Sequence, residues 1–199
     1  MKKIIQITLF LSIFASINAL NAQLQVSVRL GVNVSNTEFR NPPQLTNNLT
    51  GFTIGVPVEI DISDYFSAQS EVCFVQKGYK STINGRNVTA NWGQTNVFGK
   101  LRLGSDKFLH TFLYFGPSLD VRLTTKGQFD RSYDLGLNFG GQIVFKRAYL
   151  DVRYQRGLTD LDTDESLNFQ VEKYARSLAV TLGFRFYKDK RNNDGNDAK

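Results

Sequence analysis

The sequence predicts an all-β fold, an eight-stranded antiparallel up-and-down transmembrane β-barrel. After the N-terminal segment, apolar and polar residues alternate with period two, and no stretch carries a convincing helical period of 3.6 residues. The alternating runs are longer than the about five or six residues usual in soluble proteins, and they match the roughly 9–11 residues of a tilted strand that crosses a bilayer. Long and short connections follow one another in turn, as in an up-and-down barrel.

The N-terminal segment has the organisation of a secretory signal. Met1-Lys2-Lys3 is basic, residues 4–17 are apolar, and small and polar residues follow up to Ala22. The apolar run is shorter than the ~20 residues of a membrane-spanning helix, so an uncleaved anchor is the less favoured alternative. We expect cleavage after Ala22, within a few residues. The predicted organisation is a signal peptide over residues 1–22, a barrel over residues 23–187 and a polar tail over residues 188–199.

The composition excludes several classes of site. The chain of 199 residues contains one Cys and one His, which excludes a disulfide framework, CxxC motifs and His-rich zinc sites. The formal charge of +6 falls to +4, with 22 basic and 18 acidic residues, once Lys2 and Lys3 leave with the signal. No block of Lys and Arg forms a basic stripe, so nucleic-acid binding is not expected. The pattern calls for no cofactor and no metal.

Three strands show the alternation most clearly. In residues 26–35 the Val and Leu side chains share one face and Ser, Arg, Gly and Asn the other. Residues 52–62 and 178–186 repeat this arrangement, although Pro57 interrupts the former. Five further segments fit the same template, namely residues 66–79, 91–103, 109–123, 133–145 and 148–158. Pro57 and Pro117 lie inside predicted strands, where we expect β-bulges or strand ends because proline cannot donate to the ladder.

The connections place all long loops at one end of the predicted barrel. We expect long or intermediate loops over residues 36–51, 80–90, 124–132 and 159–174, and short turns over residues 63–65, 104–107 and 146–147. Both termini then lie at the short-turn end, which in an outer membrane is the periplasmic side.

The distribution of charge decides which face of the sheet is lined by lipid. One face is nearly free of charge at mid-strand, and the other carries twelve charged residues: Arg29, Glu59, Asp61, Glu71, Lys100, Arg102, Asp120, Arg122, Asp134, Asp151, Arg153 and Arg185. Aromatic residues gather near the strand ends, as in the two interfacial girdles of membrane barrels. Those near the short turns are Tyr65, Phe66, Phe108, Phe145, Phe186 and Tyr187, and those near the long loops are Phe52, Tyr79, Phe129, Tyr133 and Tyr174. We therefore favour a membrane barrel over the alternative, a secreted soluble barrel that carries a lipophilic ligand.

Six short segments resemble the PorT-like outer-membrane β-barrel proteins of Gram-negative bacteria. They are RLGVNVSN at residues 29–36, QKGYK at 76–80, FGP at 115–117, LDVRY at 150–154 with GLT at 157–159, and LGFRF at 182–186. The resemblance implies an eight-stranded outer-membrane barrel and no particular activity. The chain departs from the family at the polar residues 91–96 and in its tail after the last strand.

The predicted interior chemistry is structural. The twelve charges comprise six of each sign, and eight strands enclose a lumen that side chains can fill. We therefore expect the charges to form a paired polar core rather than a path for ions. His110 is a candidate general base, but the sequence contains no nucleophile motif such as GxSxG, so catalysis is not expected. Residues 160–165 space acidic side chains like a calcium loop but place Glu165 where Gly is needed. Cys73 is expected to be a small interior residue.

The expected function is non-enzymatic: structural, or accessory to surface binding or assembly through extracellular loops. The expected environment is the lipid of the outer membrane, and the expected state is a monomer. The first and last long loops carry apolar side chains suited to a protein or surface ligand, namely Phe39, Leu45, Leu49, Leu167, Phe169 and Val171.

Overall fold

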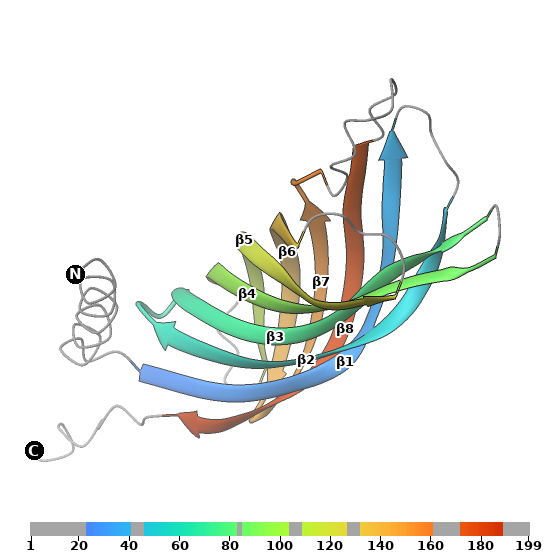
Figure 1. The fold of residues 1–199 in the computed structure, drawn as a ribbon. Helices are drawn as coiled ribbons and strands as arrows, with labels where there is room; N and C mark the ends of the chain where they lie inside the picture. Colours follow the sequence, from blue (N-terminus) through green and yellow to red (C-terminus); the bar gives the residue numbers. More distant parts are fainter. Residues whose placement is uncertain are drawn as a thin grey trace, which may run out of the picture.

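The computed structural model describes residues 23–40, 46–82, 85–103, 109–126, 132–160 and 172–188 (Figure 1). The predicted signal peptide, the acidic residues 161–165 and the predicted tail beyond Lys188 lie outside these ranges. So do four of the six apolar loop residues, Leu45, Leu167, Phe169 and Val171. Among the described residues, no helix is long and apolar enough to span a membrane.

Eight strands form one closed antiparallel barrel in which each strand pairs with its neighbours in sequence and β1 pairs with β8. The strands are β1 (Gln23–Arg40), β2 (Thr46–Asp61), β3 (Phe66–Ser81), β4 (Asn87–Leu103), β5 (Leu109–Lys126), β6 (Tyr133–Phe145), β7 (Ala148–Gly157) and β8 (Glu172–Lys188). The predicted fold class and the number of strands are therefore confirmed. Figure 1 shows the start of β1 and the end of β8 at the same end of the barrel, here called the terminal end; the opposite end is the far end.

The strands extend further at the far end than the sequence predicts. β1 continues to Arg40, which pairs with Glu172 of β8, and Thr46 of β2 pairs with Ser81 of β3. Much of the sequence assigned to long loops is thus paired strand, and the predicted loop boundaries over residues 36–51 and 80–90 are wrong. The reason is physical: beyond the apolar band both faces are polar, so the alternation that reveals a strand disappears while its backbone hydrogen bonds persist.

Neither proline within a strand creates a bulge or ends its strand, contrary to the prediction. Pro57 lies between the pairs Val26–Val58 and Arg29–Gly55, and the β1–β2 register is the same on both sides of it. Pro117 lies inside β5, which continues to Lys126, and it pairs with Leu137 of β6 in unbroken register. Each proline removes one backbone donor from its strand, and the register on either side of it is unchanged.

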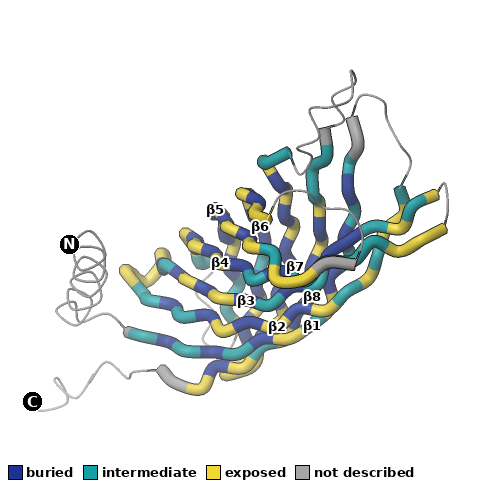
Figure 2. Tube along the Cα trace, viewed as in Figure 1, coloured by how far each residue is buried: buried dark blue, intermediate teal, exposed yellow. Residues whose placement is uncertain are grey.

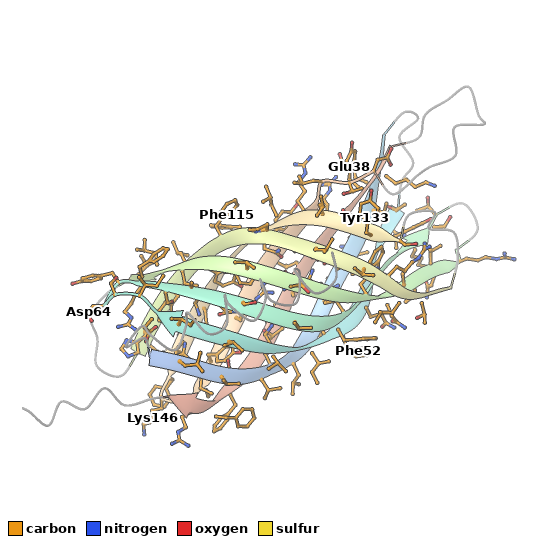
Figure 3. All side chains as sticks on the ribbon, turned by 60° about the vertical axis from the view of Figure 1, so that its left-hand side comes forward. Glu38, Phe52, Asp64, Phe115, Tyr133 and Lys146 are labelled. Carbon is orange, nitrogen blue, oxygen red and sulfur yellow. The ribbon has the colours of Figure 1, made fainter. Side chains whose placement is uncertain are left out.

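Large apolar side chains cover the outside of the barrel and polar ones fill the inside. Leu30, Val72 and Leu182 are each more than 60% exposed. In Figure 2 exposed and buried residues alternate along each strand, and Figure 3 shows Phe115 pointing outward near mid-barrel. This arrangement inverts that of a soluble barrel and is the one that lipid requires.

Several predicted girdle aromatics point outward near the strand ends. Tyr65, Phe66, Phe145 and Phe186 are exposed at the terminal end, while Phe52 and Tyr133 are exposed towards the far end. Phe52 also stacks on Phe74 of β3, with ring centroids 5.4 Å apart. Phe108 and Phe129 lie outside the described residues.

Because the outward face lies against lipid, a charged side chain introduced there should destabilise the barrel more at the middle of the bilayer than near its surface. Phe115→Arg at mid-strand should lower the free energy of unfolding from lipid vesicles by about 2–4 kcal/mol, because the guanidinium enters hydrocarbon. The matched control Tyr133→Arg, near the far end, should cost only about 0–1 kcal/mol. The two side chains are similarly exposed, at 57% and 49%, so depth is the variable. Equal costs in a urea titration would contradict the predicted orientation of the sheet.

Candidate functional site

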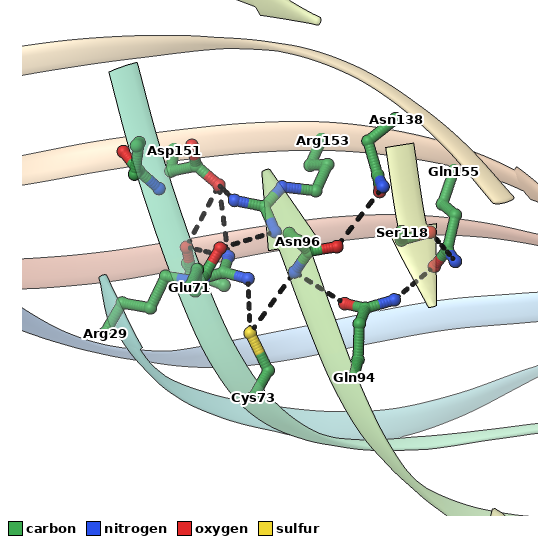
Figure 4. Close-up of polar contacts among 12 residues, drawn as sticks. Arg29, Glu71, Cys73, Gln94, Asn96, Ser118, Asn138, Asp151, Arg153 and Gln155 are labelled. Carbon is green, nitrogen blue, oxygen red and sulfur yellow. Dashed lines mark hydrogen bonds and ion pairs between the residues drawn. The ribbon is translucent and has the colours of Figure 1, made fainter. Parts of the chain in front are cut away.

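The barrel interior is a connected network of charged and amide side chains, arranged in three layers along the barrel axis. Because inward residues alternate along every strand, each strand supplies side chains to more than one layer. Amide side chains link the layers: Asn138 donates to Asn96, and Asn96 donates to Gln94, each at 3.3 Å. Figure 4 shows the middle layer and these links.

The layer near the terminal end is centred on Lys100 of β4. Its Nζ lies 2.7 Å from a Glu59 carboxylate oxygen and donates to Gln69 and Gln142 at 3.0 and 2.7 Å. Glu59 also pairs with Arg185 at 3.4 Å. The Lys100 ammonium therefore has three oxygen partners, which matches its three donors.

The middle layer joins two arginines and two carboxylates. Glu71 of β3 pairs with both Arg29 and Arg153, the latter at 2.9 Å. Asp151 of β7 contacts the same two guanidinium groups at 3.2 and 3.8 Å and accepts a hydrogen bond from the Tyr114 hydroxyl at 2.6 Å. The Arg153 guanidinium also lies 4.5 Å from the centroid of the Phe98 ring. All four charged side chains are almost fully buried, so each depends on the others for its stabilisation.

The layer towards the far end is centred on Asp120 of β5. It accepts from Lys77 at 2.5 Å, from Gln94 at 2.7 Å and from Gln155 at 2.9 Å. Lys77 also donates to Gln155 at 2.7 Å. Closer to the far end, the Asp134 carboxylate accepts a hydrogen bond from the Thr159 backbone N–H at 3.3 Å.

The twelve predicted interior charges fall into two groups. Nine are buried and mostly joined in the network: Arg29, Glu59, Glu71, Lys100, Asp120, Asp134, Asp151, Arg153 and Arg185. Asp61, Arg102 and Arg122 are half-buried nearer the strand ends and make separate contacts. Asp61 accepts from Gln25 at 2.8 Å, Arg102 lies over the Phe112 ring, and Arg122 donates to Ser132 at 3.4 Å.

Sequence reasoning missed Lys77 and the inward amides. Lys77 has the same strand parity as Glu71 and Cys73, which would have placed it inside. Gln94 and Asn96 account for the unusual polarity of the fourth strand, because they point inward and bridge the layers. Parity could have identified these residues, whereas their partners on other strands follow only from the register.

The interior leaves little free volume. One cavity beside Lys77 and Trp92 and another beside Arg29 and Gln94 each have a volume of about 10 Å³. Such a volume holds about one water molecule. Among the described residues, the network therefore fills the barrel around these two cavities, neither of which has room for a small-molecule ligand.

The residues considered for catalysis or metal binding do not gather into a site. His110 is half-buried in β5 near the terminal end, one residue from the strand start. Cys73 is buried and receives a hydrogen bond from Arg29 at 3.3 Å. Among the described residues, no group of three or more His, Cys, Asp or Glu could hold a metal ion.

A family profile described as the outer membrane protein beta-barrel domain matches residues 7–193 of the chain. Similar solved structures include Ail of Yersinia pestis, with 13% identity, coverage of 84% of this chain and 100% of Ail, and a TM-score of 0.47. The outer membrane enzyme PagL has 10% identity, coverage of 79% and 98%, and a TM-score of 0.49. OprG of Pseudomonas aeruginosa has 10% identity, coverage of 82% and 96%, and a TM-score of 0.47. A search of curated proteins gives no match.

The middle layer predicts a large effect of removing one carboxylate. Glu71→Gln should lower the free energy of unfolding by about 3–5 kcal/mol, because Arg29 and Arg153 are then left with Asp151 alone. The control is Glu38→Gln, which breaks the solvent-accessible Arg176–Glu38 pair, with side chains 45% and 27% exposed, and should cost about 0–1 kcal/mol. Urea unfolding in vesicles measures both, and similar values would show that the network does not stabilise the barrel.

Proposed function

Because the chain belongs to the outer membrane protein β-barrel domain family, we propose that it is a non-enzymatic barrel that acts through its far end. Its location is the outer membrane, and lipid surrounds its apolar face. We further propose that it is a monomer with structural or accessory roles in surface binding or assembly.

The observation that carries this proposal is the filled interior. Nine buried charges, together with Lys77 and several amides, occupy the lumen, and the two interior cavities each have room for one water molecule. An ion or solute path would require these ion pairs to separate in a medium of low dielectric constant. A lipophilic ligand would require an apolar interior, so the polar network also argues against the soluble carrier.

The far end is the part of the molecule best placed to meet a partner. Outer-membrane barrels have their short turns in the periplasm and their longer loops outside the cell, so the far end is extracellular in this proposal. There β1, β2, β3, β4 and β8 extend as paired strands beyond the apolar band. They form a polar wall that could support a protein contact together with the loops.

Two alternatives receive less support. An enzyme would need a nucleophile, a base and an orienting group within reach of one another, and His110 lies at the opposite end from the loops. The resemblance to the PorT-like proteins implies no particular activity, and although one member of that family is tied to a protein-secretion pathway, nothing in the described residues supports carrying that role over. We therefore propose the family's general architecture and a loop-based contact without that role.

The proposal predicts that the barrel conducts no ions. Purified mature protein in planar bilayers should give no steady ionic current above the protein-free baseline, because the ion pairs fill the lumen. Discrete, reproducible channel openings would contradict this part of the proposal.

The far end should be required for the protein's function in cells. Replacing residues 41–45 and 82–86 by Gly-Ser segments of the same lengths should abolish complementation of a deletion strain in surface adhesion and in outer-membrane protein composition. The barrel of this variant should remain folded, as judged by heat-modifiable gel mobility. The control removes residues 189–199, which follow β8 in the sequence, and should complement normally. Full complementation by the loop variant would overturn the proposed role of the far end.

A further inference from the structure

The ladder between β1 and β2 ends before either strand does. Their register ends at the pair Ser35–Leu49, after which β1 follows β8 up to Arg40 and β2 follows β3 from Thr46. Side chains bridge the two strands there: the Thr46 hydroxyl donates to Asn36 at 2.5 Å, and the Asn36 amide donates to the Thr46 carbonyl at 3.3 Å. Figure 1 shows β1 and β8 rising together while β2 leans away with β3 and β4.

A hollow of about 400 Å³ lies at this divergence and is open to the outside of the barrel. Its apolar part is formed by Tyr154, Leu178 and Val34, which are neighbours across β7, β8 and β1. Its polar part is formed by Asn36, Asn48, Glu38 and Arg176. The hollow thus spans the boundary between the lipid-facing band and the polar far end, where lipid headgroups lie.

Two arginines adjoin the polar part of the hollow. Arg176 of β8 is the cross-strand neighbour of both Asn36 of β1 and Arg156 of β7. Arg156 and Arg176 are both exposed, and like charges directly opposite one another destabilise a sheet. Glu38 pairs with Arg176 at 2.5 Å and balances one of the two charges. Among the described residues, the cluster of Arg156, Arg176 and Glu38 therefore has a formal charge of one positive unit.

We propose that the hollow binds the phosphate headgroup of an anionic lipid in the outer leaflet. One phosphodiester supplies the single negative charge that the cluster lacks, and its oxygens accept hydrogen bonds from guanidinium and amide groups. Its acyl chains lie along Tyr154, Leu178 and Val34, which continue the apolar band. The anion also relieves the repulsion between Arg156 and Arg176. This inference depends on the location in the outer membrane and is independent of the proposed loop contacts.

The test uses the mature protein in nanodiscs of phosphatidylcholine that contain a small fraction of a spin-labelled lipid. The nitroxide lies near the top of one acyl chain, and the headgroup is phosphatidylglycerol, phosphatidylcholine or glucosyl diacylglycerol. Broadening of the Leu178 amide signal, relative to the outward Leu123 of β5, reports occupancy. We expect about fivefold enrichment of phosphatidylglycerol at Leu178 over each other lipid.

Variants separate charge from general adhesion of lipid. Arg156→Gln combined with Arg176→Gln should abolish the enrichment, while Lys80→Gln combined with Arg86→Gln changes the net charge equally on β3 and the β3–β4 connection and should leave it unchanged. Glu38→Gln should strengthen the enrichment, because it removes the carboxylate that competes for Arg176. The Glu38→Gln variant keeps the test valid if the variant that lacks both Arg156 and Arg176 does not fold.

Three results would overturn the inference. Equal broadening by the three lipids would show that the hollow selects no headgroup. A preference for the glucosyl lipid would assign it to sugars rather than phosphate. Loss of the phosphatidylglycerol preference on adding millimolar inorganic phosphate, with shifts of the Asn36 and Arg176 amides, would assign the site to a free anion.

Discussion

The pairing of β1 with β8 is the constraint on which the rest of the structure depends. In hydrocarbon an unpaired sheet edge would leave backbone N–H and C=O groups without partners, so the sheet must close. The β1–β8 register runs from Gln25–Lys188 to Arg40–Glu172 and shifts only between Val26 and Ser27. Closure at eight strands gives a narrow lumen, and a narrow lumen lined by one face of every strand must be filled by side chains.

Filling the lumen with charge is workable because closure brings opposite charges from non-adjacent strands together around one narrow lumen. Arg29 of β1 meets Asp151 of β7 across β8, a contact between residues at opposite ends of the barrel sequence. Glu71 of β3 contacts Arg153 from the other side of the lumen. Such pairs make the interior specific to this register, because sliding one strand by two residues would separate several of them at once.

The sequence was sufficient to predict the fold class, the number of strands and which face of each strand is polar, since period-two alternation marks the strands and the charged residues mark the inward face. It was not sufficient to predict contacts between strands, because parity places Lys77 inside but does not pair it with Asp120 of β5. It also failed where alternation ends: residues 36–40 and 46–51 are mainly polar and carry one large apolar side chain each, Phe39 and Leu49, so paired strand could not be distinguished from loop.

The divergence of β1 from β2 also occurs where the apolar band of the barrel ends. Within the apolar band an unpaired backbone group is costly, so the two strands stay together up to Ser35 and Leu49. Beyond the band water and side chains can satisfy these groups, and the Asn36 and Thr46 side chains do so across the opening. The wall of the barrel is therefore free to open only where lipid tails give way to headgroups. An outward hollow at this boundary presents apolar side chains below and polar ones above, which is the pattern that an amphiphile requires.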